Sequence, residues 1–164
     1  MTSTSQPIHV KPAVRPPREL VSSTSFLLKR LGFAVKDRVH DRYEAAGASP
    51  FHLTVLAVLD EGARETQATI ADALGYDRSY LVGLLDDLEE RSLIERKRDP
   101  ADRRRHIVKL TPAGKKTLAK LRALQATIDD DFFAPLHAEE RATFHTLLHR
   151  LATYHDPRFG NGHS

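Results

Sequence analysis

Two short helical segments, separated by a brief gap that contains a glycine, constrain the fold of this chain more than any other feature. In the first segment Ile70 and Leu74 provide an apolar stripe, and Thr66 is a residue type that caps a helix N-terminus. Gly75 adopts a left-handed conformation easily, which predicts the end of that helix. Asp77 can cap a second helix, whose apolar stripe consists of Leu81, Leu84, Leu85 and Leu88. So short a gap predicts a helix-turn-helix unit.

The residues that follow change from a helical to a strand pattern. Residues 93–98 and 105–110 are short runs joined by the turn-forming segment 99–102, which predicts a two-stranded hairpin. A lone hairpin is marginal in water, so we expect its apolar side to pack on the preceding helices. Between Arg91 and Lys109 there are eight basic and three acidic residues. This local surplus is typical of a phosphate-binding surface, and the alternative is a solvated charged face.

Longer amphipathic helices flank this unit on both sides. Apolar residues at spacings of three and four predict a helix over residues 25–47, and the Ser-Pro pair at 49–50 predicts the start of another. The Thr-Pro pair at 111–112 repeats that signal before a further long helix, and a last helix begins near residue 137. The buried face predicted for the last helix consists of Phe144, Leu147, Leu148 and Leu151. The predicted fold class is therefore mainly α with one small β-hairpin.

The composition excludes several functional classes. The 164-residue chain contains no cysteine, which excludes disulfides, thiolate nucleophiles and cysteine-bound zinc. It lacks the motifs of serine hydrolases, phosphate-binding loops and zinc proteases, so we predict neither an enzyme nor a cofactor. No apolar run is long enough to span a bilayer, and the N-terminus has no apolar signal stretch. We therefore expect a cytoplasmic protein without a membrane partner.

Two clusters of possible metal ligands have simpler interpretations. His145 and His149 are four residues apart on a predicted helix, a spacing at which two imidazoles can share a metal. No third ligand is obvious, so surface or dimer-interface histidines are the better interpretation. Asp129, Asp130 and Asp131 are interpreted as a solvated helix end rather than a cation site. We predict no metal site.

Over residues 20–155 these features resemble the MarR family of bacterial regulators. The resemblance is carried by TIADALGYDRSYLVGLLDDLEERSLIER at 69–96 and by DPADRRRHIVKLTPAG at 99–114. The wing of that family has an aspartate, any residue and an arginine, and a Leu-Thr pair closes its second strand. The residues at those spacings here are Asp102, Arg104, Leu110 and Thr111. Two positions depart from the family: Ser92 stands where a glycine is usual, and Gly83 where a basic residue is common.

The resemblance implies a winged helix-turn-helix protein with N- and C-terminal dimerisation helices. The apolar stripes of these terminal helices exceed what two short helices and a hairpin can cover, which favours burial against a second copy. A two-fold homodimer would match a pseudo-palindromic operator in double-stranded DNA, and repression would follow by blocking polymerase at the nucleoid. The expected organisation is one domain at 19–155 between a disordered, basic, proline-rich tail at 1–18 and a flexible tail at 156–164. Within the domain, the reading part is expected at 49–111 and the dimerisation helices at 20–47 and 111–155.

The residues expected to contact DNA lie at the start of the second short helix and at the hairpin tip. Candidates for reading base edges in the major groove are Arg78, Ser79, Tyr80 and Val82. The resemblance assigns Arg104 to a neighbouring minor groove and Asp102 to the acid that orients it. For Arg103 and Arg105, phosphate contact and a solvated charge are both open.

Family members commonly release DNA when a small aromatic or anionic effector binds between the dimerisation and reading parts. Arg42, Tyr43 and His52 are candidates for lining such a pocket, and the alternative is that they are core, interface or surface residues. A second functional hypothesis is a winged-helix protein–protein module, in which the basic hairpin meets an acidic partner without sequence-specific DNA binding.

Overall fold

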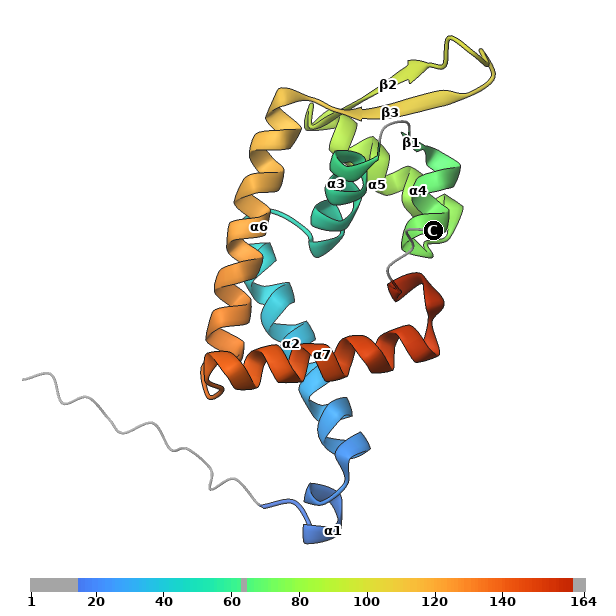
Figure 1. Cartoon of the computed structure of the whole chain (residues 1–164). Coiled ribbons are helices and arrows are strands. Elements are labelled where there is room, and N and C mark those ends of the chain that lie inside the picture. The colour runs from blue at the N-terminus through green and yellow to red at the C-terminus, as the bar shows by residue number, and fades with distance from the viewer. Residues whose placement is uncertain (1–14, 63–64, 161–164) are drawn as a thin grey trace, which may run out of the picture. The chain divides into compact units, whose positions relative to one another are not determined.

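The computed structural model describes residues 15–62 and 65–160 of the chain. Its helices and strands, labelled in Figure 1, are α1 (Arg18–Val21), α2 (Thr24–Ala45), α3 (Pro50–Glu61), β1 (Glu65–Thr66), α4 (Gln67–Leu74), α5 (Arg78–Glu90), β2 (Ile94–Arg98), β3 (His106–Leu110), α6 (Pro112–Phe132) and α7 (Ala138–His155). The 3-10 turn η1 (Pro157–Phe159) follows α7. One compact unit ends at Lys36 and a second begins at Asp37. The mainly helical fold with a small hairpin, predicted from the sequence, is confirmed.

The helix boundaries follow from the capping residues that the sequence shows. Ser49, Thr66 and Thr111 each accept a backbone hydrogen bond at the start of α3, α4 and α6. Gly75 ends α4 with a φ of 64°, the left-handed conformation that glycine adopts at little cost. Asp77 caps α5 two residues later. The predicted helix-turn-helix unit therefore consists of α4, the turn at Gly75 and α5.

The predicted two-stranded hairpin is part of a three-stranded sheet with the order β1-β3-β2. The hairpin pairs Ile94 with Leu110 and continues to the pair of Arg98 and His106. On the other side of β3, β1 is only two residues long and leads directly into α4, so it has no period-2 pattern to detect. Ile107 and Val108 are both buried. The expected alternation of buried and exposed residues therefore fails at this pair in the central strand.

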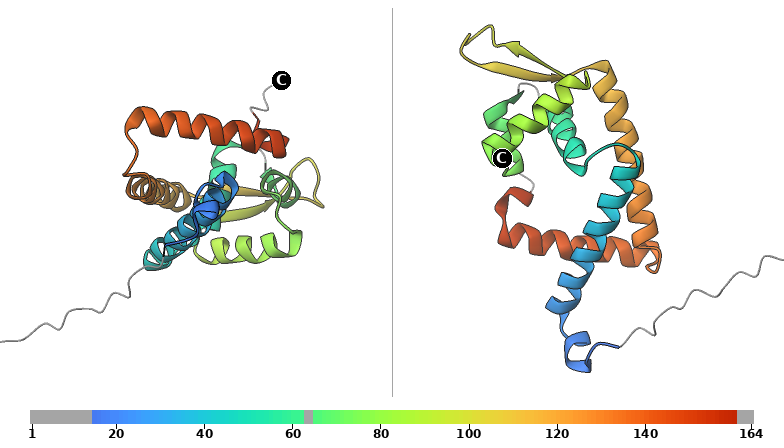
Figure 2. Two further views of the ribbon diagram at one scale, coloured as in Figure 1. Left: turned by 90° about the horizontal axis from the view of Figure 1, so that it is seen from below. Right: turned by 180° about the vertical axis from the view of Figure 1, so that it is seen from behind.

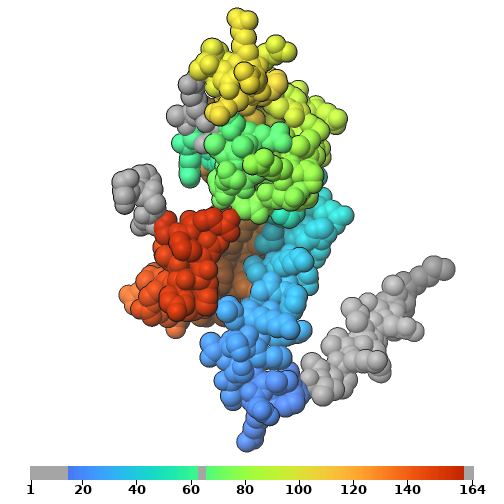
Figure 3. All heavy atoms as spheres, turned by 90° about the vertical axis from the view of Figure 1, so that its right-hand side faces the viewer, coloured from blue at the N-terminus to red at the C-terminus, as the bar shows by residue number. Residues whose placement is uncertain are grey.

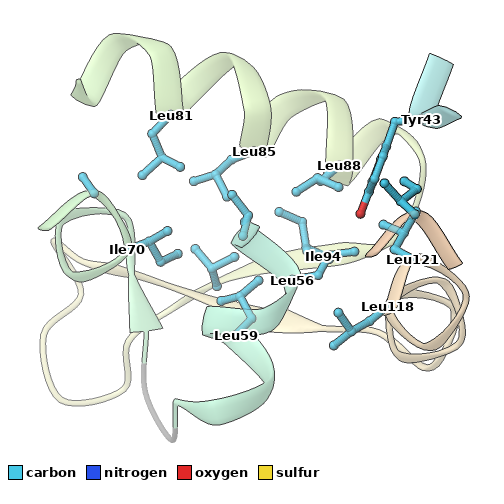
Figure 4. Close-up of a cluster of buried hydrophobic side chains, with 14 residues drawn as sticks. Tyr43, Leu56, Leu59, Ile70, Leu81, Leu85, Leu88, Ile94, Leu118 and Leu121 are labelled. Carbon is cyan, nitrogen blue, oxygen red and sulfur yellow. The ribbon is translucent and has the colours of Figure 1, made fainter. Parts of the chain in front are cut away.

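The core lies between α3, α4, α5, the sheet and α6, all within the second unit (Figure 4). Its buried side chains include Tyr43, Leu56, Leu59, Ile70, Leu81, Leu85, Leu88, Ile94, Leu118 and Leu121. Both predicted stripes of the helix-turn-helix unit contribute to it, because apolar residues three and four positions apart share one face of each helix. This core fixes α5 and the hairpin relative to α3 and α6.

The apolar faces of α2 and α7 are exposed in the single chain. No residue of α7 is buried, and the side chains of Leu147 and Leu151 are 44% and 52% exposed. On α2, Leu28 and Leu31 are exposed as well. The predicted buried face of the last helix is therefore not buried within one chain. Among the described residues, none of the helices combines the length and apolar character needed to cross a membrane.

The ends of the chain differ from the sequence expectation where the structure describes them. Most of the predicted N-terminal tail, residues 1–14, lies outside the described residues, and α1 begins within the rest of it. The predicted C-terminal tail contains η1, because Asp156 and Pro157 repeat the signal of a cap followed by proline. Arg158 of η1 lies against the backbone of Gly75. Figure 2 shows α6 leading from the sheet to α7, and α7 leading back toward α4.

Candidate nucleic-acid interface

The N-terminus of α5 is capped by Asp77. The carboxylate Oδ1 of Asp77 accepts hydrogen bonds from the backbone N–H of Ser79 at 2.8 Å and of Tyr80 at 3.3 Å, and the Ser79 hydroxyl donates to the same oxygen. The hydrogen bond from the Ser79 hydroxyl is the main reason that the pKa of Asp77 is lowered. The cap therefore satisfies backbone N–H groups in the first turn of α5 and stabilises the start of the helix.

All four candidates on α5 are exposed, and within the described part of the chain three of them have no partner ring or polar side chain from another element. Leu81 and Leu85 point into the core, whereas Arg78, Ser79 and Val82 are exposed. Among the described residues, the guanidinium of Arg78 has no hydrogen-bond or ion-pair partner. The hairpin projects beyond α4 and α5 on the same side of the second unit (Figure 3). These side chains and the hairpin tip can therefore reach one extended ligand together.

The fourth candidate, Tyr80, belongs to a group of three rings that we call the aromatic cluster: Phe51, Tyr76 and Tyr80. Each ring meets the other two edge to face, with centroids 5.5 to 5.8 Å apart. The hydroxyl groups of Tyr76 and Thr54 are 3.0 Å apart. Tyr80 is 45% exposed, so its outer edge is still accessible. The cluster joins α3, the turn and α5. Phe51 and Tyr76 were not predicted as site residues, because the only sequence signal for the cluster is the spacing of four between Tyr76 and Tyr80.

The hairpin tip has a more specific arrangement than the resemblance implies. Oδ1 of Asp102 accepts a hydrogen bond from the backbone N–H of Arg104 at 3.0 Å, and Oδ2 forms an ion pair with Nε of Arg105 at 3.4 Å. The backbone N–H of Arg105 donates to the Asp102 carbonyl at 2.9 Å. Asp102 therefore shapes the turn and holds the side chain of Arg105, while it touches only the backbone of Arg104.

The eight basic residues of the wing region fall into two groups. Four have acidic partners inside the fold: Arg91, Arg96, Lys97 and Arg105. In the part of the chain that the structure describes, the other four have no hydrogen-bond or ion-pair partner on their side chains: Arg98, Arg103, Arg104 and Lys109. Three of these four flank the tip of the hairpin. Arg98 was not among the sequence candidates, although it ends the first strand of the basic run.

Arg96 connects the wing to the second half of α5. Its Nε donates to Oε2 of Glu89 at 2.8 Å, its backbone N–H donates to Oε1 of the same carboxylate at 3.1 Å, and its guanidinium also pairs with Asp86. The hydrogen bond between these side chains lowers the pKa of Glu89 and raises the pKa of Arg96. The Arg96 side chain is only 24% exposed.

On the other flank of α5, His52 connects the helix to α3. Its Nε2 lies 2.7 Å from Oδ2 of Asp87, and its Nδ1 accepts a hydrogen bond from the backbone N–H of Ser49 at 3.3 Å. Arg91 donates to Asp87 at 2.9 Å and to the carbonyl of Gly47 at 3.1 Å. Burial lowers the pKa of His52, and this effect outweighs the opposite influence of Asp87. His52 therefore has a structural contact at both ring nitrogens.

The other two candidates for an effector pocket contact α6. The Tyr43 hydroxyl donates to Oε1 of Gln125 at 3.2 Å, and burial raises its pKa. Arg42 forms an ion pair with Asp131 at 3.4 Å. The structure therefore gives Arg42, Tyr43 and His52 partners within the fold, which agrees with the alternative that they are core and surface residues.

The two clusters of possible metal ligands lie on different helices, the aspartates on α6 and the histidines on α7. In the acidic run at the end of α6, Asp130 pairs with Arg141 at 2.9 Å, and Asp129 accepts a hydrogen bond from Gln125 at 2.9 Å. The rings of His145 and His149 stack with their centroids 6.2 Å apart. No group of three or more metal-ligating side chains occurs among the described residues.

Comparison with known proteins relates the reading part to one family. Residues 47–105 match the model of the MarR family. A putative transcriptional regulatory protein for the hcr operon of Thauera aromatica is 37% identical over 105 residues, which are 64% of this chain. The match spans 63% of the Thauera protein, which is less than two thirds of that protein's length. The transcriptional regulator HosA of Escherichia coli is 32% identical over 102 residues, which are 62% of this chain and 75% of HosA.

A solved structure extends the likeness to most of the fold. The transcriptional repressor CouR, bound to a 23-mer DNA duplex, is 34% identical and has a TM-score of 0.73, covering 82% of this chain and 96% of CouR. CouR from Rhodococcus jostii RHA1 has also been solved with p-coumaroyl-CoA, and that structure has a TM-score of 0.69 at 27% identity, covering 86% of this chain and 97% of CouR.

Proposed function

Since this chain belongs to the MarR family of transcriptional regulators, we propose that it is a repressor that binds a pseudo-palindromic operator as a homodimer. The observation that supports this most directly is the pairing of an exposed, capped first turn of α5 with a hairpin tip at which Arg98, Arg103 and Arg104 have no acidic partner among the described residues. The major groove of B-DNA admits an α-helix, and unpaired cations replace the counterions of phosphates.

In this proposal the candidate residues have distinct roles. Arg78, Ser79 and Val82 face base edges in the major groove. Tyr80 contacts the same groove with its exposed edge, while its ring packs in the aromatic cluster. Arg104 enters the adjacent minor groove. The remaining tip residues act on the backbone: Arg103 and Arg98 contact phosphates, Arg105 stays paired with Asp102, and Asp102 keeps the turn in shape.

The terminal helices would supply the dimer contact. Several apolar side chains are exposed on α7 and on the first half of α2, and grouped exposed apolar residues are typical of surfaces that bind another protein. We therefore assign residues 19–155 to one dimer-forming domain with a reading part at 49–111. Two reading parts related by a two-fold axis would engage half-sites about one helical turn apart.

The protein would act without catalysis, in the cytoplasm with its DNA, and in response to a small aromatic or anionic effector. Support for an effector comes from CouR, whose solved structure holds p-coumaroyl-CoA. Arg42, Tyr43 and His52 would take part by giving up contacts that they make inside the fold. Since His52 and Asp87 connect α3 to α5, a ligand that displaced this contact would also release the reading helix.

The decisive experiment is selection of genomic fragments by the full-length protein, followed by titration of the selected site and of random DNA. We expect a pseudo-palindrome to be enriched. Arg78→Ala should then weaken binding to the selected site by about 1–3 kcal/mol and weaken random DNA much less, because a bidentate base contact carries sequence information. Lys120→Ala on the exposed side of α6 removes the same charge and is the control. Failure to enrich any palindrome would favour the protein–protein module.

A further inference from the structure

The reading helix carries negative charge on the side that is proposed to meet DNA. Its second half contains Asp86, Asp87, Glu89 and Glu90. Asp86 is seven residues after Ser79 and four after Val82, so it lies on the same helical face as those candidate base readers. A carboxylate at that place would repel phosphates and would cost binding free energy unless it were neutralised.

One residue of the wing neutralises two of these acids. The guanidinium of Arg96 pairs with both Asp86 and Glu89, and its Nη2 lies 2.6 Å from Oε2 of Glu89. Charge-assisted hydrogen bonds of this forked kind are the strongest in proteins and fix geometry as well as charge. The backbone N–H of Arg96 donates to Glu89 too, so strand β2 and not only its side chain is attached to α5.

We propose that Arg96 is a positioning residue for DNA binding, which holds the wing against the reading helix and supplies a built-in counter-ion for Asp86 and Glu89. The inference rests on the proposed function, since it concerns how the same interface is assembled. It separates Arg96 from Arg98, Arg103 and Arg104, whose side chains lack such partners. Arg96 therefore strengthens DNA binding without contacting DNA, and it adds nothing to the number of counterions released.

The test compares operator binding of four full-length proteins at several salt concentrations: the natural sequence, Arg96→Gln, Lys97→Gln and the triple variant Asp86→Asn/Glu89→Gln/Arg96→Gln. We expect Arg96→Gln to weaken binding by on the order of tenfold, because it leaves two carboxylates unpaired beside phosphates. Lys97, the matched control, pairs with Glu95 on the same strand and with no acid of α5 among the described residues. Its loss should weaken binding by less than about threefold. The triple variant also removes the two carboxylate charges and should therefore bind more tightly than Arg96→Gln.

Two outcomes would overturn the proposal. One is binding by a folded Arg96→Gln protein as tight as that of the natural sequence. The other is a triple variant that binds no better than Arg96→Gln, which would rule out Arg96 as the counter-ion of Asp86 and Glu89. Arg96→Lys, which keeps the charge but loses the fork, should fall between the natural sequence and Arg96→Gln and guards against a variant that fails to fold.

A second measurement works without DNA. Amide hydrogen exchange in strand β2 should be roughly tenfold faster in Arg96→Gln than in Lys97→Gln, because the wing opens more often once its side-chain ion pairs with α5 are lost. Equal exchange in both variants would show that Arg96 does not hold the wing. If the natural protein selected no DNA, the proposed function would fail, while the exchange result would still decide this part of the inference.

Discussion

Individual arginines at the wing tip differ in what surrounds them, and this difference predicts their effects. Arg104 is exposed, and in the described part of the chain its side chain has no polar partner. Arg104→Ala should therefore weaken operator binding while leaving the melting temperature nearly unchanged. If the contact replaces counterions, the slope of log affinity against log salt should flatten by roughly 0.9 for each lost contact. Titration at several salt concentrations measures this, with Lys120→Ala as the matched loss of charge.

A substitution of Asp102 tests whether the hairpin tip must have a defined shape to bind DNA. Its carboxylate accepts from the Arg104 amide and pairs with Arg105, so Asp102→Ala should loosen the turn and weaken operator binding. Simple electrostatics predicts the opposite, because removing an acid near DNA should tighten binding. Tighter binding by Asp102→Ala would contradict a shaped tip and would indicate a diffuse basic patch.

His52 is expected to make stability depend on pH. Its pKa is lowered in the folded protein by burial, so the unfolded chain, with a histidine pKa of about 6.5, binds the proton more readily. The contribution of His52 to stability is therefore complete above about pH 6.5 and is lost as the pH falls from there toward the folded pKa. Asp87 and Arg91 are the charged groups that face it.

The measurement is the melting temperature at pH 8 and at pH 5.5 for the natural sequence and for His52→Gln. The other eight histidines are common to both proteins, so the difference between the two pH dependences reports His52. We expect a smaller fall in the variant. An equal fall in both would mean that His52 does not titrate differently in the folded and unfolded chains.

At the scale of elements, the aromatic cluster should hold α5 against α3. Tyr80→Ala removes two edge-to-face contacts and should destabilise the protein by about 0.5–1.5 kcal/mol for each. Tyr80→Phe keeps the rings and should leave stability unchanged. Denaturant unfolding measures this. Operator binding then separates two roles, because a loss of affinity in Tyr80→Phe, whose stability is unchanged, would mean that the hydroxyl contacts DNA.

Elements whose signals are local could be predicted from the sequence, and contacts between distant segments could not. Thr66, Gly75 and Asp77 act within a few residues of themselves, so the helix-turn-helix unit was predicted with its caps. Strand β1 was missed because its two residues become a strand only through pairing with β3. Asp156 followed by a proline is a recognisable signal for the start of a helix, although residues 156–164 are predicted to be a flexible tail.

The candidate site was predicted in part for the same reason. Exposure at the start of α5 and at the hairpin tip follows from the helical and strand patterns. Ion pairs such as that of Arg96 with Glu89 depend on how a strand lies across a helix, and no sequence spacing fixes that. The basic run therefore looked uniform in the sequence, although half of its residues are paired inside the fold.

For the whole molecule, the exposed apolar face of α7 predicts a surface that a second copy covers. The double variant Leu147→Glu/Leu151→Glu should shift the protein from dimer to monomer in sedimentation analysis and should abolish operator binding. Ala142→Glu, exposed on the opposite side of the same helix, is the control and should do neither. A natural protein that sediments as a monomer at micromolar concentration would contradict the proposed homodimer.

The aromatic cluster also gives the molecule an optical property. The chain contains no tryptophan and four tyrosines, so its ultraviolet fluorescence comes from tyrosine alone. Two of the four, Tyr76 and Tyr80, lie edge to face at the junction of α3 and α5. A movement of the reading helix would change the surroundings of half of the emitting groups. Unlabelled protein can therefore report such a movement spectroscopically, and Phe51→Trp would place one red-shifted emitter at the same junction.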